Sequence, residues 1–134
     1  MDESLVMAVW RRAGSRCEYC LMPQEYDTLT FQIDHIIAEQ RGGLTRLANL
    51  ALSCFACNHY KGPNLSGIDR AGSEFLPVRL FNPRRHKWSR HFRYKGPELT
   101  GLTAIGRATV EVLAINLRHR VALREFLMKA ELFF

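Results

Sequence analysis

The sequence predicts a small α+β fold within a single domain spanning residues 1–134. Segments with helical periodicity lie near both ends of the chain, and two short β-rich segments lie in its first half. All four cysteines occur as two Cys-x-x-Cys pairs. A 134-residue chain supports only a modest hydrophobic core,. The paired cysteines therefore point to a metal site that stabilises that core.

The two cysteine pairs supply four soft thiolate ligands, which is the set that a closed, tetrahedral, structural zinc site requires. They are Cys17, Cys20, Cys54 and Cys57. The 33 residues between the pairs form a loop that the metal closes. A redox role for one Cys-x-x-Cys pair explains neither the second pair nor the spacing. A closed site leaves no open position, so this zinc is expected to be structural and not catalytic.

The chain begins with charged residues instead of an apolar leader, and no apolar run approaches the roughly 18 residues of a membrane span,. We therefore expect a soluble, cytoplasmic protein with reduced, metal-bound thiols and no membrane partner.

Helical periodicity predicts three terminal helices. Residues 3–13 place apolar side chains on one face, and Gly14 is suited to end the helix,. A C-terminal helical hairpin is expected over about 100–134: one helix starts at Thr100 or Thr103 and ends near Asn116, and the second spans about 118–130. The inward face of the second helix is expected to carry Leu123, Phe126, Leu127 and Ala130.

The middle of the first half predicts a β-hairpin followed by a helix. Residues 28–33 alternate and are rich in β-branched and aromatic side chains, so they predict a strand that ends at Asp34 and His35,. Residues 50–53 predict the second strand, and 55–61 a helix that Gly62 and Pro63 stop. Residues 63–78 are expected to form a loop.

The positive charge is concentrated in one segment. The net charge is +6, yet residues 75–98 hold seven lysines and arginines against one acidic residue. This pattern is typical of a surface that binds a polyanion, although a solvated basic face is the alternative. We expect residues 79–95 to be extended around Asn82 and Pro83, with Trp88, Phe92 and Tyr94 packing and not stacking on bases. The candidate phosphate-binding residues are Arg84, Arg85, Lys87, Arg90 and Arg93,.

Five sequence elements in order resemble the HNH endonuclease family, in its four-cysteine, zinc-containing branch. They are Cys-Glu-Tyr-Cys at 17–20, Ile-Asp-His-Ile at 33–36, Gly42-Gly43, the segment 47–54 and Cys-Asn-His-Tyr-Lys-Gly at 57–62. The resemblance covers about a third of the chain. It implies a treble-clef-like ββα-metal core over about 15–62 and cleavage of DNA, expected to be double-stranded, into 5′-phosphate and 3′-hydroxyl ends.

Phosphodiester hydrolysis needs an activated water and a cation that offsets charge on the phosphoryl oxygens. His35 is the candidate general base, because imidazole titrates near neutral pH. Asp34 is the candidate ligand for Mg²⁺ or Mn²⁺, with the amide oxygen of Asn58 as second ligand and His59 as its rival. The resemblance implies that Asn49 braces the loop and orients the base.

Two readings remain beside a DNA endonuclease: a zinc-stabilised nucleic-acid-binding module without activity, and an HNH nuclease that acts on RNA. Lys61 follows Asn58 by one helical turn and either contacts a substrate phosphate or lies in solvent. The sequence does not determine site specificity, nicking against double-strand cleavage, biological role or oligomeric state.

Overall fold

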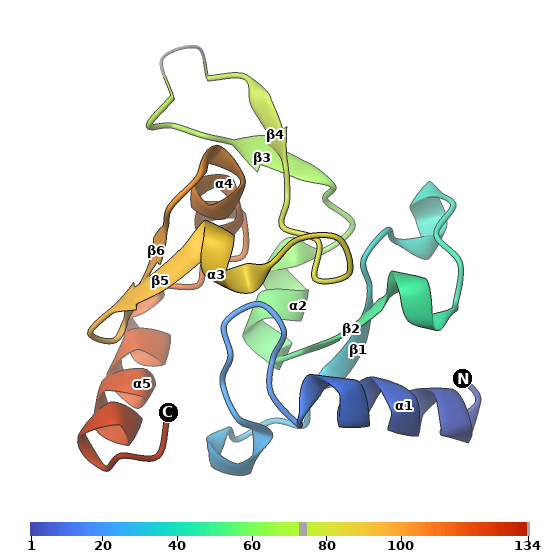
Figure 1. Ribbon diagram of the computed structural model, residues 1–134, viewed down its shortest axis with the longest axis horizontal. Coiled ribbons are helices and arrows are strands. Elements are labelled where there is room, and N and C mark those ends of the chain that lie inside the picture. Colours follow the sequence, from blue (N-terminus) through green and yellow to red (C-terminus); the bar gives the residue numbers. More distant parts are fainter. Residues whose placement is uncertain (73–74, 134) are drawn as a thin grey trace.

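The computed structural model describes residues 1–72 and 75–133, and within them helices are combined with small antiparallel hairpins (Figure 1). The helices are α1 (Glu3–Ala13), α2 (Phe55–Lys61), α3 (Trp88–His91), α4 (Ala104–Val112) and α5 (Arg118–Lys129). The strands pair as β1 (Gln32–His35) with β2 (Leu50–Ser53), β3 (Ser66–Ile68) with β4 (Pro77–Arg79), and β5 (Phe92–Lys95) with β6 (Glu98–Gly101). Short 3-10 turns are η1 (Gln24–Tyr26), η2 (Glu39–Arg41) and η3 (Leu47–Asn49). The predicted α+β class is confirmed.

Hairpin β1–β2 is the centre of the first half, with α1 packed on β2 and α2 on β1. The side chain of Asp2 caps α1 by accepting a hydrogen bond from the Ser4 N–H at 2.7 Å, and Gly14 ends it in a left-handed conformation,. Both α1 and α2 have the bounds that the sequence predicts, as does β2. All four residues of β2 are buried, so this strand lies inside the core.

Strand β1 begins later than predicted, because residues 28–31 find other hydrogen-bond partners. The N–H of Phe31 donates to the side chain of Gln24 at 2.6 Å, and the N–H of Thr28 donates to Asp27. Only Gln32 to His35 pair with β2, in a register that sets Asp34 opposite Ala51. Asp34 and His35 are the last two residues of β1, at the end of the strand as predicted.

Two segments in the second half carry more regular structure than the sequence indicates. The expected loop 63–78 contains the hairpin β3–β4, and the expected extended block 79–95 contains the helical turn α3 before β5. Helix α4 packs on β6 and on β3–β4, with Thr103 capping it by accepting from the Gly106 N–H,. It ends at Val112, earlier than expected.

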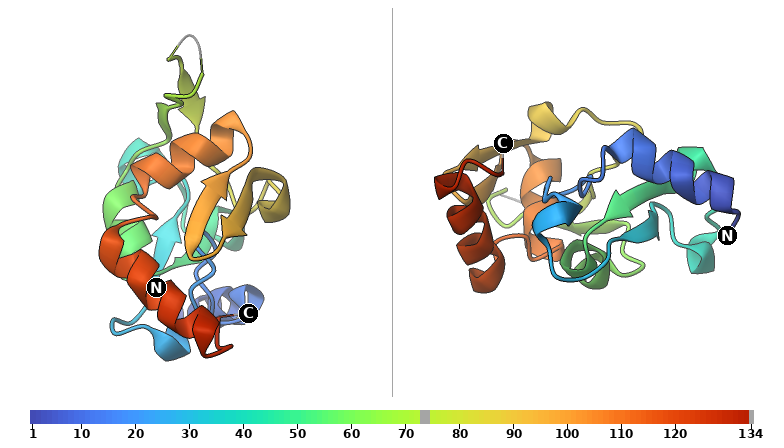
Figure 2. Two further views of the ribbon diagram at one scale, coloured as in Figure 1. Left: turned by 90° about the vertical axis from the view of Figure 1, so that its left-hand side faces the viewer. Right: turned by 90° about the horizontal axis from the view of Figure 1, so that it is seen from below.

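Helix α5 buries arginines where the sequence predicts a wholly apolar face. Phe126, expected inward, is 67% exposed, whereas Arg120, Arg124 and Leu127 are buried. The guanidinium of Arg124 is satisfied by the carbonyls of Pro97 and Ile115. Helices α1 and α5 lie at opposite ends of the molecule (Figure 2), and α5 is held by these polar contacts together with the buried side chain of Leu127.

The second half of the chain contacts the first Cys-x-x-Cys segment, Cys17–Cys20, here called the knuckle. The indole N–H of Trp88 donates to the Tyr19 carbonyl at 2.8 Å, and the Tyr94 hydroxyl donates to the Cys20 carbonyl. Phe92 is buried, as predicted for a packing residue. One hydrophobic cluster includes residues from Val9 to Phe133. Over the described ranges, no helix has the length and apolar character needed to cross a bilayer.

Candidate zinc site and catalytic hairpin

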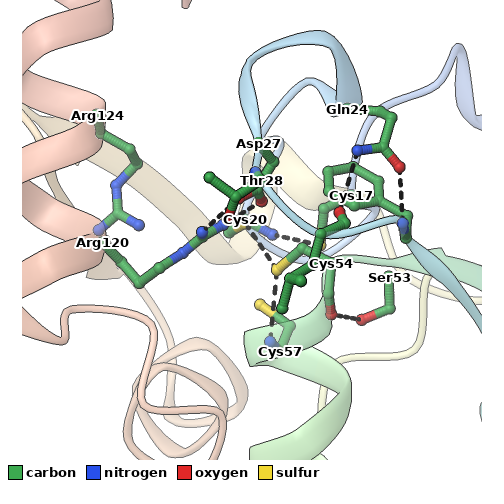
Figure 3. Close-up of polar contacts among 12 residues, drawn as sticks. Cys17, Cys20, Gln24, Asp27, Thr28, Ser53, Cys54, Cys57, Arg120 and Arg124 are labelled. Atoms are coloured by element: carbon green, nitrogen blue, oxygen red, sulfur yellow. Dashed lines mark hydrogen bonds and ion pairs between the residues drawn. The ribbon is translucent and has the colours of Figure 1, made fainter.

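The four cysteine sulfurs converge at the base of hairpin β1–β2. Their Sγ atoms all lie within 4.8 Å of one another, and the four residues are buried (Figure 3). The Sγ atoms of Cys20 and Cys54 are 3.8 Å apart. Tetrahedral zinc with bonds of about 2.3 Å sets its sulfur ligands about 3.8 Å apart, whereas a disulfide needs about 2.05 Å. The cluster therefore fits a structural zinc ion.

Backbone N–H groups point at two of the sulfurs. The Cys20 N–H donates to Cys17 Sγ at 3.5 Å, and the Cys57 N–H donates to Cys54 Sγ at 3.4 Å. The second contact makes Cys54 the cap of α2, so metal binding and the start of that helix share one side chain,. Burial raises the pKa of the Cys17 thiol, so a thiolate in this position depends on a bound cation,.

Arg120 brings a positive charge from α5 to this sulfur cluster (Figure 3). Its guanidinium donates to both oxygens of Asp27, at 2.9 and 2.8 Å. Burial acts to lower the pKa of Arg120, but the bonds to Asp27 and the negative potential of Cys54 and Cys20 outweigh it and raise that pKa. Four thiolates around Zn²⁺ carry a net negative charge, which this cation partly offsets.

Asp34 is buried and its carboxylate already has two partners. Oδ2 accepts from the Tyr19 hydroxyl at 2.8 Å and lies 3.1 Å from the ammonium nitrogen of Lys61. Burial raises the pKa of Asp34, while Lys61 and the Tyr19 hydroxyl act in the opposite direction. A carboxylate offers about four lone-pair positions, so these donors do not exhaust it.

Lys61 is 2% exposed, so the expectation that its side chain lies in solvent is wrong. Besides Asp34, its ammonium donates to the backbone carbonyls of His35 and Ile36, each at 3.2 Å. The side chain thus links α2 to the end of β1. Its three donors are fully used, and no signal in the sequence distinguishes such a lysine from an exposed one.

Asn58 contacts β1 from the helix side. Its amide donates to the side chain of Gln32, two residues before Asp34 and so on the same side of the strand,. His59 is exposed and stacks on Phe55, with ring centroids 5.8 Å apart. Of the two candidates for the last motif position, Asn58 is therefore the one turned toward the strand that carries Asp34. A carboxylate and an amide oxygen together suit a hard divalent cation.

The His35 ring is 17% exposed and is held by one nitrogen. Its Nε2 lies 2.8 Å from the Thr45 hydroxyl, with the carboxylate of Glu39 at 3.7 Å. In the part of the chain that the structure describes, no group bonds to Nδ1. The sequence reasoning missed Thr45, since a threonine after a glycine pair carries no distinctive signal.

Asn49 ties together the loop between the strands. Its side chain accepts from the Ile37 N–H and donates to the carbonyls of Ile37 and Leu44, all at 2.9 Å. Gly43 permits this, because a Cβ there would lie 1.7 Å from the Ile37 carbonyl oxygen,. Holding Leu44 also fixes the neighbouring Thr45, and through it the ring of His35.

The candidate phosphate-binding residues divide into two groups. Arg84 is largely withdrawn, because its guanidinium pairs with Glu18 and its side chain is 17% exposed. The other four are exposed on the surface: Arg85, Lys87, Arg90 and Arg93.

Comparison with known proteins gives one family. Residues 17–64 match the family model described as HNH endonuclease. No curated protein and no solved structure matches the chain. The matched range contains the cysteine cluster and hairpin β1–β2, and it supports a nuclease or nucleic-acid-related function with metal binding at the four cysteines.

We expect purified protein to contain about one zinc per chain and Cys54→Ser to lose it. Structural zinc contributes an apparent 10–16 kcal/mol or so in small domains, about the whole stability of a protein this size, so the variant unfolds. Metal analysis and circular dichroism measure both. Met22→Leu is the control, since it removes a buried sulfur outside the cluster. A folded, zinc-free Cys54→Ser protein would contradict the assignment.

Lys61→Met should lower the free energy of unfolding by about 3–5 kcal/mol, because it leaves the Asp34 carboxylate buried without its cation. Urea unfolding with zinc bound measures this. Lys87→Met, an exposed counterpart, should change it by less than about 0.5 kcal/mol. If Lys61 instead contacted phosphate, its removal would spare stability and weaken the salt dependence of DNA binding.

Proposed function

We propose that the protein is a metal-dependent HNH endonuclease that hydrolyses DNA phosphodiester bonds within a single domain, leaving 5′-phosphate and 3′-hydroxyl ends. The main support is the imidazole of His35, which is fixed by a hydrogen bond and follows Asp34 directly in the strand. One ring nitrogen is fixed by Thr45 and the other has no described partner. Both residues lie on a strand that the cysteine cluster and α2 hold in place.

The chemistry begins with a proton transfer at Nδ1 of His35. When Nε2 carries the ring hydrogen and donates it to Thr45, Nδ1 has its lone pair free to accept a proton from water. The resulting hydroxide attacks phosphorus, the bond between phosphorus and the 3′ oxygen breaks, and the departing 3′ oxygen takes a proton from solvent to become the 3′-hydroxyl.

Asp34 and Asn58 are the residues that would hold Mg²⁺ or Mn²⁺, which offsets charge on the phosphoryl oxygens and the leaving oxygen when bound. In that role, the Asp34 carboxylate would bind the metal through lone pairs that the Tyr19 hydroxyl and the Lys61 ammonium leave free. Lys61 also fixes the carbonyl of His35, so the base and the ligand keep one relative position. Exposed arginines and lysines between residues 85 and 93 supply sequence-independent phosphate contacts.

A non-catalytic nucleic-acid-binding module is the second candidate, and the Asp34–Lys61 contact favours it. A carboxylate satisfied by an internal ammonium does not need a divalent ion to be buried. Cleavage assays decide between the two, and parallel DNA and RNA digests decide the substrate.

His35→Ala should reduce plasmid cleavage in Mg²⁺ or Mn²⁺ by about 10²–10⁴-fold, because it removes the general base. Single-turnover digestion across a metal panel measures this, with zinc content and circular dichroism confirming the fold. His59→Ala is the matched control and should retain activity, as His59 stacks on the helix surface. Undiminished cleavage by His35→Ala would rule out the mechanism.

Thr45→Val should lower the cleavage rate constant by about tenfold and change its pH profile, because the ring loses the partner that fixes its tautomer. Thr45→Ser keeps the hydroxyl and should restore both. A purely structural threonine would instead give a normal pH profile in the valine variant, with loss of stability alone.

A further inference from the structure

A cavity of about 410 Å³ lies between the β1–β2 loop and the turn that follows β4. In Figure 1 these are the loop that leads from β1 to β2 and the turn after β4. The polar groups that line the cavity are Arg46, Arg79, Asn82, Arg84, Arg85 and Asn49. Its apolar wall includes Ile37, Leu44 and Ala48.

Three of the arginines in this cavity are exposed and have no ion pair or side-chain hydrogen bond with any residue in 1–72 or 75–133. They are Arg46, Arg79 and Arg85. Among the residues that the structure describes, no carboxylate lines the cavity. The amide group of Asn82 can add a donor, since its Oδ1 is turned back to accept from the Arg84 N–H at 2.8 Å.

The charge around the cavity is not neutralised. Arg84 pairs with Glu18, but one of its guanidinium nitrogens, Nη1, is buried without a described acceptor. The same positive charges act on His86: burial lowers the pKa of its imidazole, and Arg79 and Arg85 lower it further. Guanidinium groups with fixed forks of donors and no acceptor among their neighbours suit phosphate oxygens.

The cavity lies across the loop from His35. Thr45 reaches the His35 ring, while its neighbours Leu44 and Arg46 line the cavity. A phosphodiester chain that crosses this loop would meet the arginines on one side and the candidate base on the other. Asn49, with its amide fully used within the loop, supplies rigidity and not a contact.

We propose that this cavity binds a backbone phosphate of the nucleic acid next to the scissile one, held by Arg46, Arg79 and Arg85. The proposal rests on the proposed function for its ligand, but it concerns binding and not cleavage. Arg46 and Arg79 come from outside the segment 84–93 that carries the other candidate phosphate contacts, so the loop of the catalytic hairpin takes part in gripping the substrate.

The test measures binding of a 20-base-pair DNA duplex, without divalent metal or chelator, at several salt concentrations. The triple variant Arg46→Gln/Arg79→Gln/Arg85→Gln should lose about tenfold in affinity at 0.1 M salt, and its salt slope should fall by about 0.9, because the variant loses one phosphate contact. The control triple, Arg11→Gln/Arg118→Gln/Lys129→Gln, removes equal charge elsewhere and should change affinity less than about threefold. Arginine Nε resonances are also followed as inorganic phosphate is added.

The outcomes separate this proposal from the proposed function. Equal losses of duplex affinity in both triple variants, or no loss in the cavity triple, would overturn the proposal that the cavity binds phosphate. Shifts of its arginine resonances with inorganic phosphate but unchanged duplex affinity also overturn it, in favour of a small-anion site. Loss confined to the cavity triple supports it, even if the wild type does not cleave. Conversely, the assays could show cleavage that depends on His35 together with cavity variants that bind DNA normally. That result would support the proposed nuclease function and rule out the cavity as a phosphate-binding site.

Discussion

Convergence of four sulfurs within 4.8 Å is the constraint on which the rest of the fold depends. The cluster joins the knuckle before β1 to the first turn of α2, and Cys54 serves as both ligand and helix cap. Strand β1 and helix α2 contribute residues to the candidate site from opposite sides, so the cysteine cluster sets the distance between them. A core of this size gains more from one ion than from any single apolar contact.

A second cation, internal to the chain, acts a short distance away. The Lys61 ammonium contacts Asp34 and the carbonyls of two successive residues of the strand end. It gives the hairpin a rigidity that hydrogen bonds between two four-residue strands do not provide. The same contact places a fixed positive charge beside the carboxylate proposed to bind a divalent ion, so ion affinity there depends on how the two cations share the oxygens.

Sequence patterns predicted the elements whose ends are marked by local chemistry. Asp2, Gly14 and Gly62 bound α1 and α2, and the Cys-x-x-Cys spacing located the sulfur cluster. Patterns failed where long-range partners decide. Gln24 takes the backbone bond that would have lengthened β1. Arg120 and Arg124 of α5 are buried against an acid and carbonyls that only the fold brings near, leaving Phe126 outside. The burial of Lys61 is likewise decided by contacts that form only in the folded protein.

The pairing of Arg120 with Asp27 beside the cysteine cluster links two distant stretches of chain through charge. With Zn²⁺ bound, four thiolates would carry a net charge of −2, and this charge would attract Arg120 and help to hold α5 against the Cys17–Cys20 segment,. Oxidation of the sulfurs to disulfides would discharge the cluster and leave a desolvated guanidinium with less compensation. The contact between α5 and the cysteine cluster would therefore weaken if the thiols were oxidised, although α5 itself contains no cysteine.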